Sequence, residues 1–147
     1  MQITQTIATI FLAATAAPPA PAAARLQPMA TTTEWTFKSA KRSCDKADNT
    51  CTWKWTVDDH VKPIDCTFVT KRNGNTPASQ AINQGPQKCG NYVTTSNWSG
   101  QFGPGNGFTA FAVVDQTRKV KAFPAYNDKE LAANPGGITR AYPVQKL

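Results

Sequence analysis

The sequence predicts a mostly β protein, folded as a small antiparallel β-barrel or sandwich with one short helix and two disulfides. Two patterns favour this class. Apolar and polar residues alternate over several short segments, which is the period of strands with one buried face. Turn-forming residues separate these segments, and all four cysteines lie in the same part of the chain. Such a protein packs its strands around a single core.

The N-terminal segment carries the pattern of an export signal. Its first 24 residues contain no charged side chain, and residues 7–14 form an apolar run followed by small residues. This pattern is typical of a secretory signal peptide, and the run is shorter than the ~20 residues that cross a bilayer. We predict a signal peptide over residues 1–16, with cleavage after Ala24 as the alternative.

A composition change separates this signal from the rest of the chain. Residues 17–33 are rich in alanine and proline and can bury little apolar surface, so we predict a disordered spacer there. Residues 34–147 have the size of one domain. We expect a single β-rich domain in a secreted, extracellular protein without a membrane span.

Within this domain, six segments have the features of strands. Trp35, Phe37 and Ser39 alternate with polar residues, and so do Trp53 and Trp55, which predicts a first hairpin. A second hairpin is predicted from residues 108–115 and 118–123, with its turn near residues 116–117. The six predicted strands cover residues 35–39, 51–57, 64–70, 92–98, 108–115 and 118–123.

Three further segments have other expected structures. Residues 76–88 show no clear period and contain two prolines, so we predict a loop with at most a helical turn over residues 79–82. Residues 100–107 contain four glycines and are predicted to be a flexible connection. Asn127 and Glu130 have the spacing of a capping box, which predicts a short helix at residues 127–133.

The cysteines predict covalent bridges. An even number of cysteines in an exported chain argues for disulfides over a metal site, and a chain with one histidine and no C-x-x-C pair does not suit zinc. Four cysteines allow three connectivities. We favour Cys44 with Cys51 and Cys66 with Cys89, because each pair would close a local loop between neighbouring strands.

Taken together, some of these features resemble a known family. They are Trp35, the four-cysteine series, and above all the segment Phe108–Asp115 with its continuation Phe123–Leu131. The chain resembles the fungal small secreted proteins that include hypersensitive-response-inducing elicitors and, more distantly, the Alternaria major-allergen-like β-barrels. The resemblance covers most of residues 35–147. It implies a compact β-barrel or sandwich exported by a fungus, no known catalytic centre, and plant tissue as the place of action.

Residues with catalytic potential are few. The only histidine, His60, follows Asp58 and Asp59 in a turn, and two adjacent carboxylates point to opposite sides of an extended chain. The glycine-rich residues 100–107 lack the strand, helix and lysine of a phosphate-binding loop. We therefore predict no catalytic site, no metal site, no cofactor, and a protein that is not an enzyme.

The tryptophans divide into two groups. Trp35, Trp53 and Trp55 fall on the apolar side of strand alternation, which predicts core packing. Trp98 lies inside the sequon Asn97-Trp98-Ser99. Asn97 is therefore a predicted glycosylation site, and it must be exposed to be used.

The net charge of +7 predicts attraction to anionic polymers or surfaces. Basic residues gather near each of the two hairpins, and a solvated face that aids solubility is the alternative interpretation. The candidate binding residues are Lys38, Lys41, Arg42 and Lys46 near the first hairpin, and Arg118, Lys119 and Lys121 in the second. Nucleic acid is not expected as a partner, because the sequence contains no aromatic-basic RNA motif.

These observations lead to one main hypothesis and two alternatives. The main hypothesis is a secreted fungal effector or elicitor, monomeric or weakly dimeric, that recognises an anionic plant or cell-wall component and induces plant defence. The first alternative is a wall-associated, carbohydrate-binding protein that uses exposed aromatic residues such as Trp98, Tyr126 or Tyr142. The second is a hydrolase with an unusual site near His60.

Overall fold

The computed structural model describes residues 33–147. The predicted signal peptide and nearly all of the spacer lie outside these residues. Neither helical segment within residues 33–147 has the length and apolar composition of a membrane-spanning helix. The elements in chain order are β1 (Glu34–Cys44), β2 (Thr50–Asp58), β3 (Pro63–Lys71), the 3-10 turn η1 (Ala78–Gln80), β4 (Gln84–Cys89), β5 (Tyr92–Ser99), β6 (Phe108–Asp115), β7 (Val120–Ala122), β8 (Ala125–Asn127), α2 (Asp128–Ala133), β9 (Ile138–Pro143) and β10 (Gln145–Lys146).

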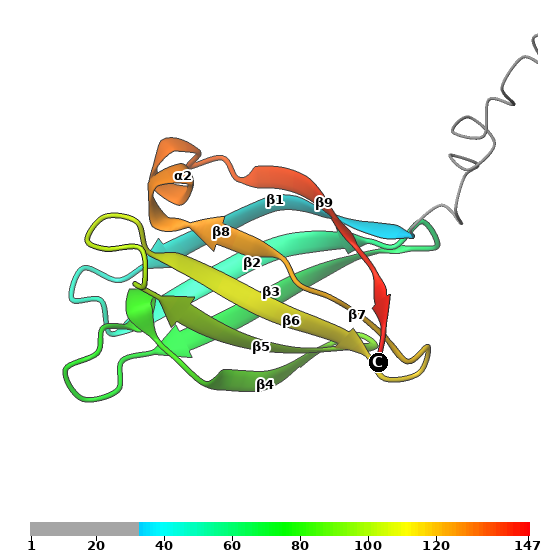
Figure 1. Cartoon of the computed structure of the whole chain (residues 1–147), viewed down its shortest axis with the longest axis horizontal. Helices are drawn as coiled ribbons and strands as arrows, with labels where there is room; N and C mark the ends of the chain where they lie inside the picture. Colours follow the sequence, from blue (N-terminus) through cyan, green and yellow to red (C-terminus); the bar gives the residue numbers. More distant parts are fainter. Residues whose placement is uncertain (1–32) are drawn as a thin grey trace, which may run out of the picture. The chain divides into compact units, whose positions relative to one another are not determined.

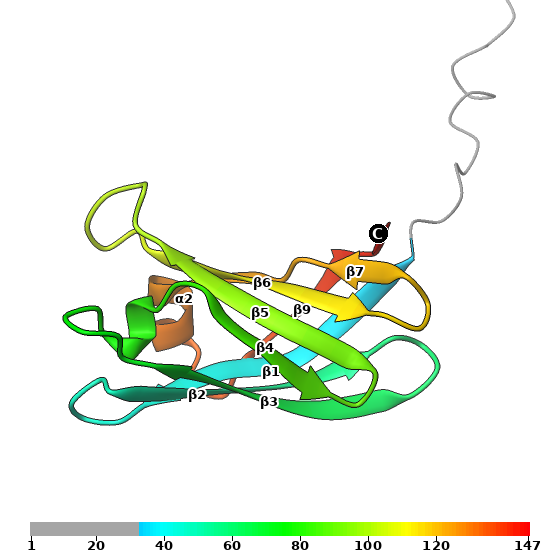
Figure 2. The same ribbon diagram turned by 90° about the horizontal axis from the view of Figure 1, so that it is seen from below.

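The strands form two sheets (Figure 1). One has four strands in the order β3-β2-β1-β9, and the other has the order β10-β7-β6-β5-β4, with β8 also paired to β6. Figure 2 shows these sheets as two layers. The mostly β class is confirmed, and of the two predicted architectures the structure has the sandwich and not the closed barrel.

The core is built from aromatic side chains of both sheets. Phe111 of β6 lies against three rings of the opposite sheet, with ring centroids 4.8 Å from Trp53, 5.1 Å from Trp55 and 5.5 Å from Phe68. Trp35, like Trp53 and Trp55, is almost fully buried. Core packing of these three tryptophans is confirmed.

A bulge in β1 changes which side chains face the core, so the alternation predicted for residues 35–39 is wrong at Ser39. Trp35 and Phe37 face the core as expected, but the register with β2 shifts between Lys38 and Lys41, and Ser39 has a positive φ of 52°. Ala40 is therefore the next buried residue, in place of Ser39. An inserted residue resets the inside-outside alternation of a strand, so Lys38 and Lys41 lie on the same outer face.

The bulge is held by β9, a strand that the sequence analysis did not predict. The Ser39 amide donates to Oγ1 of Thr139 at 3.0 Å. Gly137 packs so closely that a Cβ there would lie 2.6 Å from the Ser39 carbonyl carbon, and its φ of 106° also favours glycine. The turn before β9 thus depends on glycine at this position.

The predicted loop over residues 76–88 contains a second unexpected strand. The short turn η1 lies near the predicted helical turn, but Gln84–Cys89 forms β4, paired to β5. This strand is at the edge of its sheet and most of its side chains are exposed or half-buried. It therefore shows no alternation from which a strand could be predicted.

Side chains and a disulfide join β4 to β3, the edge strand of the other sheet. The Gln87 side-chain amide accepts from the Val69 backbone amide at 2.9 Å and donates to the Val69 carbonyl at 2.6 Å. Cys66 and Cys89 are bonded across the same gap. Gln87 thus satisfies backbone groups that an edge strand otherwise leaves unpaired.

The other disulfide joins Cys44 to Cys51, which are directly paired across the β1–β2 hairpin. Both bridges have the pairing that the sequence analysis favoured. The predicted β6–β7 hairpin and the α2 helix with its capping box are confirmed: Asn127 accepts from the Glu130 amide, and Glu130 accepts from the Asn127 amide.

A polar cluster joins the sheets at one end of the sandwich. Arg118 donates to Asp115 at 2.6 Å and to Asp59 at 2.7 Å, and the Tyr92 hydroxyl donates to Asp59 at 2.9 Å. Burial alone would raise the pKa of Asp59. The backbone amides of residues 61 and 62, together with Tyr92 and Arg118, outweigh burial and lower that pKa from 3.8 to about 2.

Acid should weaken the fold through this cluster. Because the pKa of Asp59 is lower in the folded protein than in the unfolded chain, its stabilisation is present above about pH 4 and is lost as the pH falls to about 2. We expect Asp59→Asn to remove ~1–2 kcal/mol from the pH-dependent part of the unfolding free energy. Urea titrations at pH 2 to 6 measure this. An identical pH dependence in variant and parent would contradict the assignment.

The contacts between the Gln87 side chain and the Val69 backbone also give a prediction. Gln87→Ala should leave the Val69 amide and carbonyl without partners. We expect this to lower the free energy of unfolding by ~1–3 kcal/mol. Hydrogen exchange at the Val69 amide should also be faster in this variant than in the parent protein. Lys88→Ala, an exposed change on the same strand, is the control and should leave that exchange unchanged. Unchanged, slow exchange at Val69 in the Gln87 variant would contradict the pairing of Gln87 with the Val69 backbone.

Candidate functional site

The bulge in β1 separates the basic residues expected near the first hairpin. Lys38 and Lys41 face solvent from the outer surface of the four-stranded sheet, and Lys46 is exposed in the β1–β2 turn. The side chain of Arg42 is only 14% exposed and is ion-paired with Asp128 at 2.9 Å. Arg42 therefore belongs to the packing of the molecule and not to its outer surface.

A lysine of β2 joins Lys38 and Lys41 on this outer surface. Lys54 lies directly across from Lys41 in the β1–β2 register. Among the described residues, Lys41 and Lys54 have no ion-pair or side-chain hydrogen-bond partner, whereas Lys38 pairs with Asp58 at 2.8 Å. Like charges directly opposite each other destabilise a sheet. We call Lys38, Lys41 and Lys54 the lysine face.

Hollows of the surface lie on either side of Lys41 and Lys54. One, of about 370 Å³, extends along β2 and β3 past Thr56 and Thr67. The other, of about 660 Å³, is bounded by Leu131 of α2. The two lysines thus stand between concave surfaces that a partner can enter.

The basic residues of the second hairpin do not form a continuous surface. Arg118 belongs to the cluster with Asp59 and Asp115. Lys121 lies 5.4 Å from the centre of the Phe123 ring, and Lys119 is exposed at a turn position with a φ of 57°. Of the two predicted basic groups, only the first contributes to a shared face.

The sequon residues have different environments. Asn97 is exposed, and its side-chain oxygen accepts from the Asn83 amide at 2.7 Å. Trp98 is half-buried and donates its indole N–H to Asp128 at 2.9 Å. A Cβ at Gly107 would collide with the Trp98 ring and lie 2.7 Å from the Asp128 carboxylate, so only glycine leaves room for the Trp98–Asp128 contact. Trp98 is therefore an anchor for the 100–107 loop.

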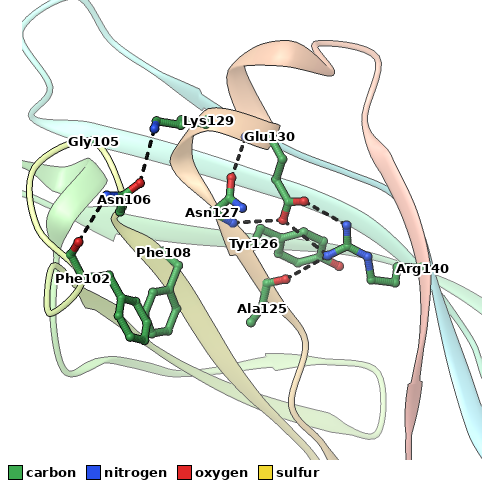
Figure 3. Close-up of a pocket in the computed structure, with 10 residues that line it drawn as sticks. All are labelled: Phe102, Gly105, Asn106, Phe108, Ala125, Tyr126, Asn127, Lys129, Glu130 and Arg140. Carbon is green, nitrogen blue, oxygen red and sulfur yellow. Dashed lines mark hydrogen bonds and ion pairs between the residues drawn. The ribbon is translucent and has the colours of Figure 1, made fainter.

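This loop forms one wall of a pocket of about 600 Å³ (Figure 3). The Phe102 ring stacks on Phe108 with a centroid distance of 5.8 Å and an interplanar angle of 30°, and Phe102 is 64% exposed. Asn106 donates to the Phe102 carbonyl at 3.2 Å and accepts from Lys129 of α2 at 3.3 Å. The glycine-rich segment thus presents an aromatic surface and is braced against the helix.

The opposite wall of the pocket is polar (Figure 3). Arg140 of β9 donates to Glu130 at 2.9 Å. This hydrogen bond to Arg140 lowers the pKa of Glu130, and that of Arg140 is raised by the same contact. The buried hydroxyl of Tyr126 has no hydrogen-bond partner among the described residues. Burial raises the pKa of Tyr126, so its hydroxyl keeps its proton.

The groups that could suggest catalysis or metal binding have other roles. His60 is exposed in the turn after β2, and Asp58 is ion-paired with Lys38. Cys44, Asp48 and Cys51 lie close enough to share an ion, but the two sulfurs are joined in a disulfide and cannot act as thiolate ligands. Asp48 instead accepts from the Ser79 amide at 2.9 Å and so holds η1 to the hairpin.

Sequence reasoning missed several residues of these two surfaces. Lys54 could have been included, because it is an outward position in the predicted strand 51–57. Phe102, Lys129 and Arg140 could not have been grouped, since they come from a loop, a helix and an unpredicted strand. Their proximity depends on the pairing of β9 with β1 and of β8 with β6.

Sequence comparisons with known proteins identify the family of this chain. Residues 36–146 match the family model described as Effector TSP1. The chain is 47% identical over 134 residues to the protein named Effector TSP1 from Hypocrea virens, an alignment that covers 90% of this chain and 89% of that protein. The chain therefore belongs to the Effector TSP1 family of fungal effector proteins.

Proposed function

We propose that this protein is a secreted fungal effector that acts outside the cell by binding a plant or cell-wall component, without catalysing a reaction. Membership of an effector family supports this function. Two disulfides suit an oxidising, extracellular location, and the sequence pattern of residues 1–16 suits export. The polar groups near His60 are engaged in structural contacts, which supports a binding role over catalysis.

The observation that carries the proposal is the direct opposition of Lys41 and Lys54. Cross-strand neighbours have Cβ atoms roughly 4.5–5.5 Å apart, so two ammonium groups there repel each other and lower the stability of the free protein. Neither lysine forms an ion pair among the described residues, and the nearby Asp65, which lines the same hollow, is bonded to the Thr56 hydroxyl. An anionic partner that bridges both lysines would relieve it.

The chemistry of the lysine face indicates the class of partner. The hollow beside Lys41 and Lys54 is lined by Thr56, Thr67 and Asp65, and the Thr56 hydroxyl donates to the Asp65 carboxylate at 2.6 Å. The two lysines supply two adjacent positive charges. These groups suit an acidic polymer or an acidic protein surface, and the net charge of +7 would speed its approach. We propose that binding of the protein to this component in plant tissue is followed by a defence response.

Neutralising the lysine face should lower binding and raise stability together. We expect Lys41→Gln combined with Lys54→Gln to reduce retention on a polygalacturonate matrix by about tenfold or more, since charge-assisted contacts are lost. The free energy of unfolding should rise by ~0.2–1 kcal/mol, because the cross-strand repulsion is removed. Salt-dependent retention and urea titration measure the two effects.

The matched control removes the same charge elsewhere. Lys46→Gln with Lys119→Gln changes two exposed turn lysines and should alter retention much less. Equal losses in the two double variants would mean that only net charge matters. Leaf infiltration of the parent protein and both double variants, with a defence marker as readout, tests the biological part. A parent protein that induces no marker would count against elicitation.

Export and modification have their own test. We expect protein secreted by the fungal host to start beyond Ala16, to contain no free thiol, and to carry a glycan on Asn97. Intact and non-reducing peptide mass spectrometry measures all three properties. Asn97→Gln should remove the added mass, and an unprocessed Met1 in the culture medium would contradict the predicted signal peptide.

A further inference from the structure

The pocket in Figure 3 combines an apolar platform with a polar wall. Large aromatic side chains are normally buried, yet the ring of Phe102 is 64% exposed and is held in place by stacking on Phe108. The Trp98–Asp128 contact and the Asn106 hydrogen bonds hold the loop around it. An exposed aromatic ring on a braced loop is a typical element of a binding site.

The charges in the pocket do not cancel. The ion pair of Arg140 with Glu130 neutralises both of those residues. Lys129 contacts only the neutral amide oxygen of Asn106, at 3.3 Å, and has no anionic partner among the described residues. One positive charge at the pocket rim therefore remains available to a ligand.

Two further features describe what the ligand must offer. The side-chain amide of Asn106 lines the pocket, and beyond its contacts with Phe102 and Lys129 it can form a further hydrogen bond with a ligand hydroxyl. The face of an aromatic ring carries partial negative charge and attracts polarised C–H groups. The ligand thus needs an apolar C–H face, several hydroxyls and one acidic group.

A sugar acid has all three properties on one ring. We infer that this pocket binds a uronic acid unit of an acidic oligosaccharide, with its C–H face on Phe102, its carboxylate at Lys129 and its hydroxyls toward Asn106. A volume of about 600 Å³ accommodates one or two sugar rings. The inference rests on the proposed extracellular location, but it does not depend on the lysine face.

Calorimetry with short saccharides tests the inference on the secreted protein with its disulfides intact. The probes are trigalacturonate as the acidic ligand and cellotriose as the neutral one. We expect the parent protein to bind trigalacturonate at least tenfold more tightly than cellotriose. Lys129→Gln should remove that preference, and Phe102→Ala should weaken the binding of trigalacturonate about tenfold or more.

Matched variants separate the pocket from other surfaces. Lys88→Gln removes an exposed lysine on β4, and Phe123→Ala removes an exposed phenyl ring outside the pocket. Neither should change trigalacturonate affinity. Circular dichroism checks that each variant retains the fold.

The outcomes distinguish this site from the lysine face. Trigalacturonate binding that survives in the Lys41→Gln, Lys54→Gln double variant but falls in Lys129→Gln supports the pocket. Binding that is lost only in the lysine-face variant overturns the inference and leaves the proposed function intact. No binding at millimolar concentration, or equal affinity for cellotriose, also overturns it.

Discussion

The two sheets are packed around the ring of Phe111, which lies in the centre of an aromatic cluster. Trp53, Trp55 and Phe68 all reach this ring across the interface between the sheets. Large aromatic side chains bury the most apolar area and dominate core energetics. With Trp53 and Trp55 fixed inward, Lys54 between them must face outward, so the core itself determines part of the lysine face.

Polar side chains complete the fold where the aromatic core ends. At one open edge, Gln87 pairs with the backbone of Val69 and a disulfide spans the same gap. At one end, Arg118 connects Asp59 to Asp115. These contacts join strands of different sheets, so they oppose the separation of the two layers that hydrogen bonds within each sheet cannot prevent.

The helix α2 connects the lysine face with the pocket. Lys129 and Glu130 line the pocket, while Leu131 bounds the hollow beside Lys41 and Lys54. Asp128 at the start of the helix binds both Arg42 and Trp98. Arg42, which we expected at the surface, therefore stabilises the start of the helix that borders both candidate sites.

The mostly β class could be predicted from the sequence, because alternation and turn residues are local signals. The sequence also predicted the inward tryptophans, the β6–β7 hairpin and the Asn127–Glu130 capping box, all of which depend on residues a few positions apart. The favoured disulfide pairing likewise followed from short loops.

Tertiary structure alone decided the features that depend on distant segments. The bulge at Ser39 is stabilised by Thr139, the strand β4 by the edge of the opposite sheet, and the burial of Arg42 by Asp128. The pocket brings Phe102 together with Arg140, which lies on a strand paired to the start of the domain. No local sequence pattern predicts such contacts, because they stabilise the protein only after the two sheets have packed together.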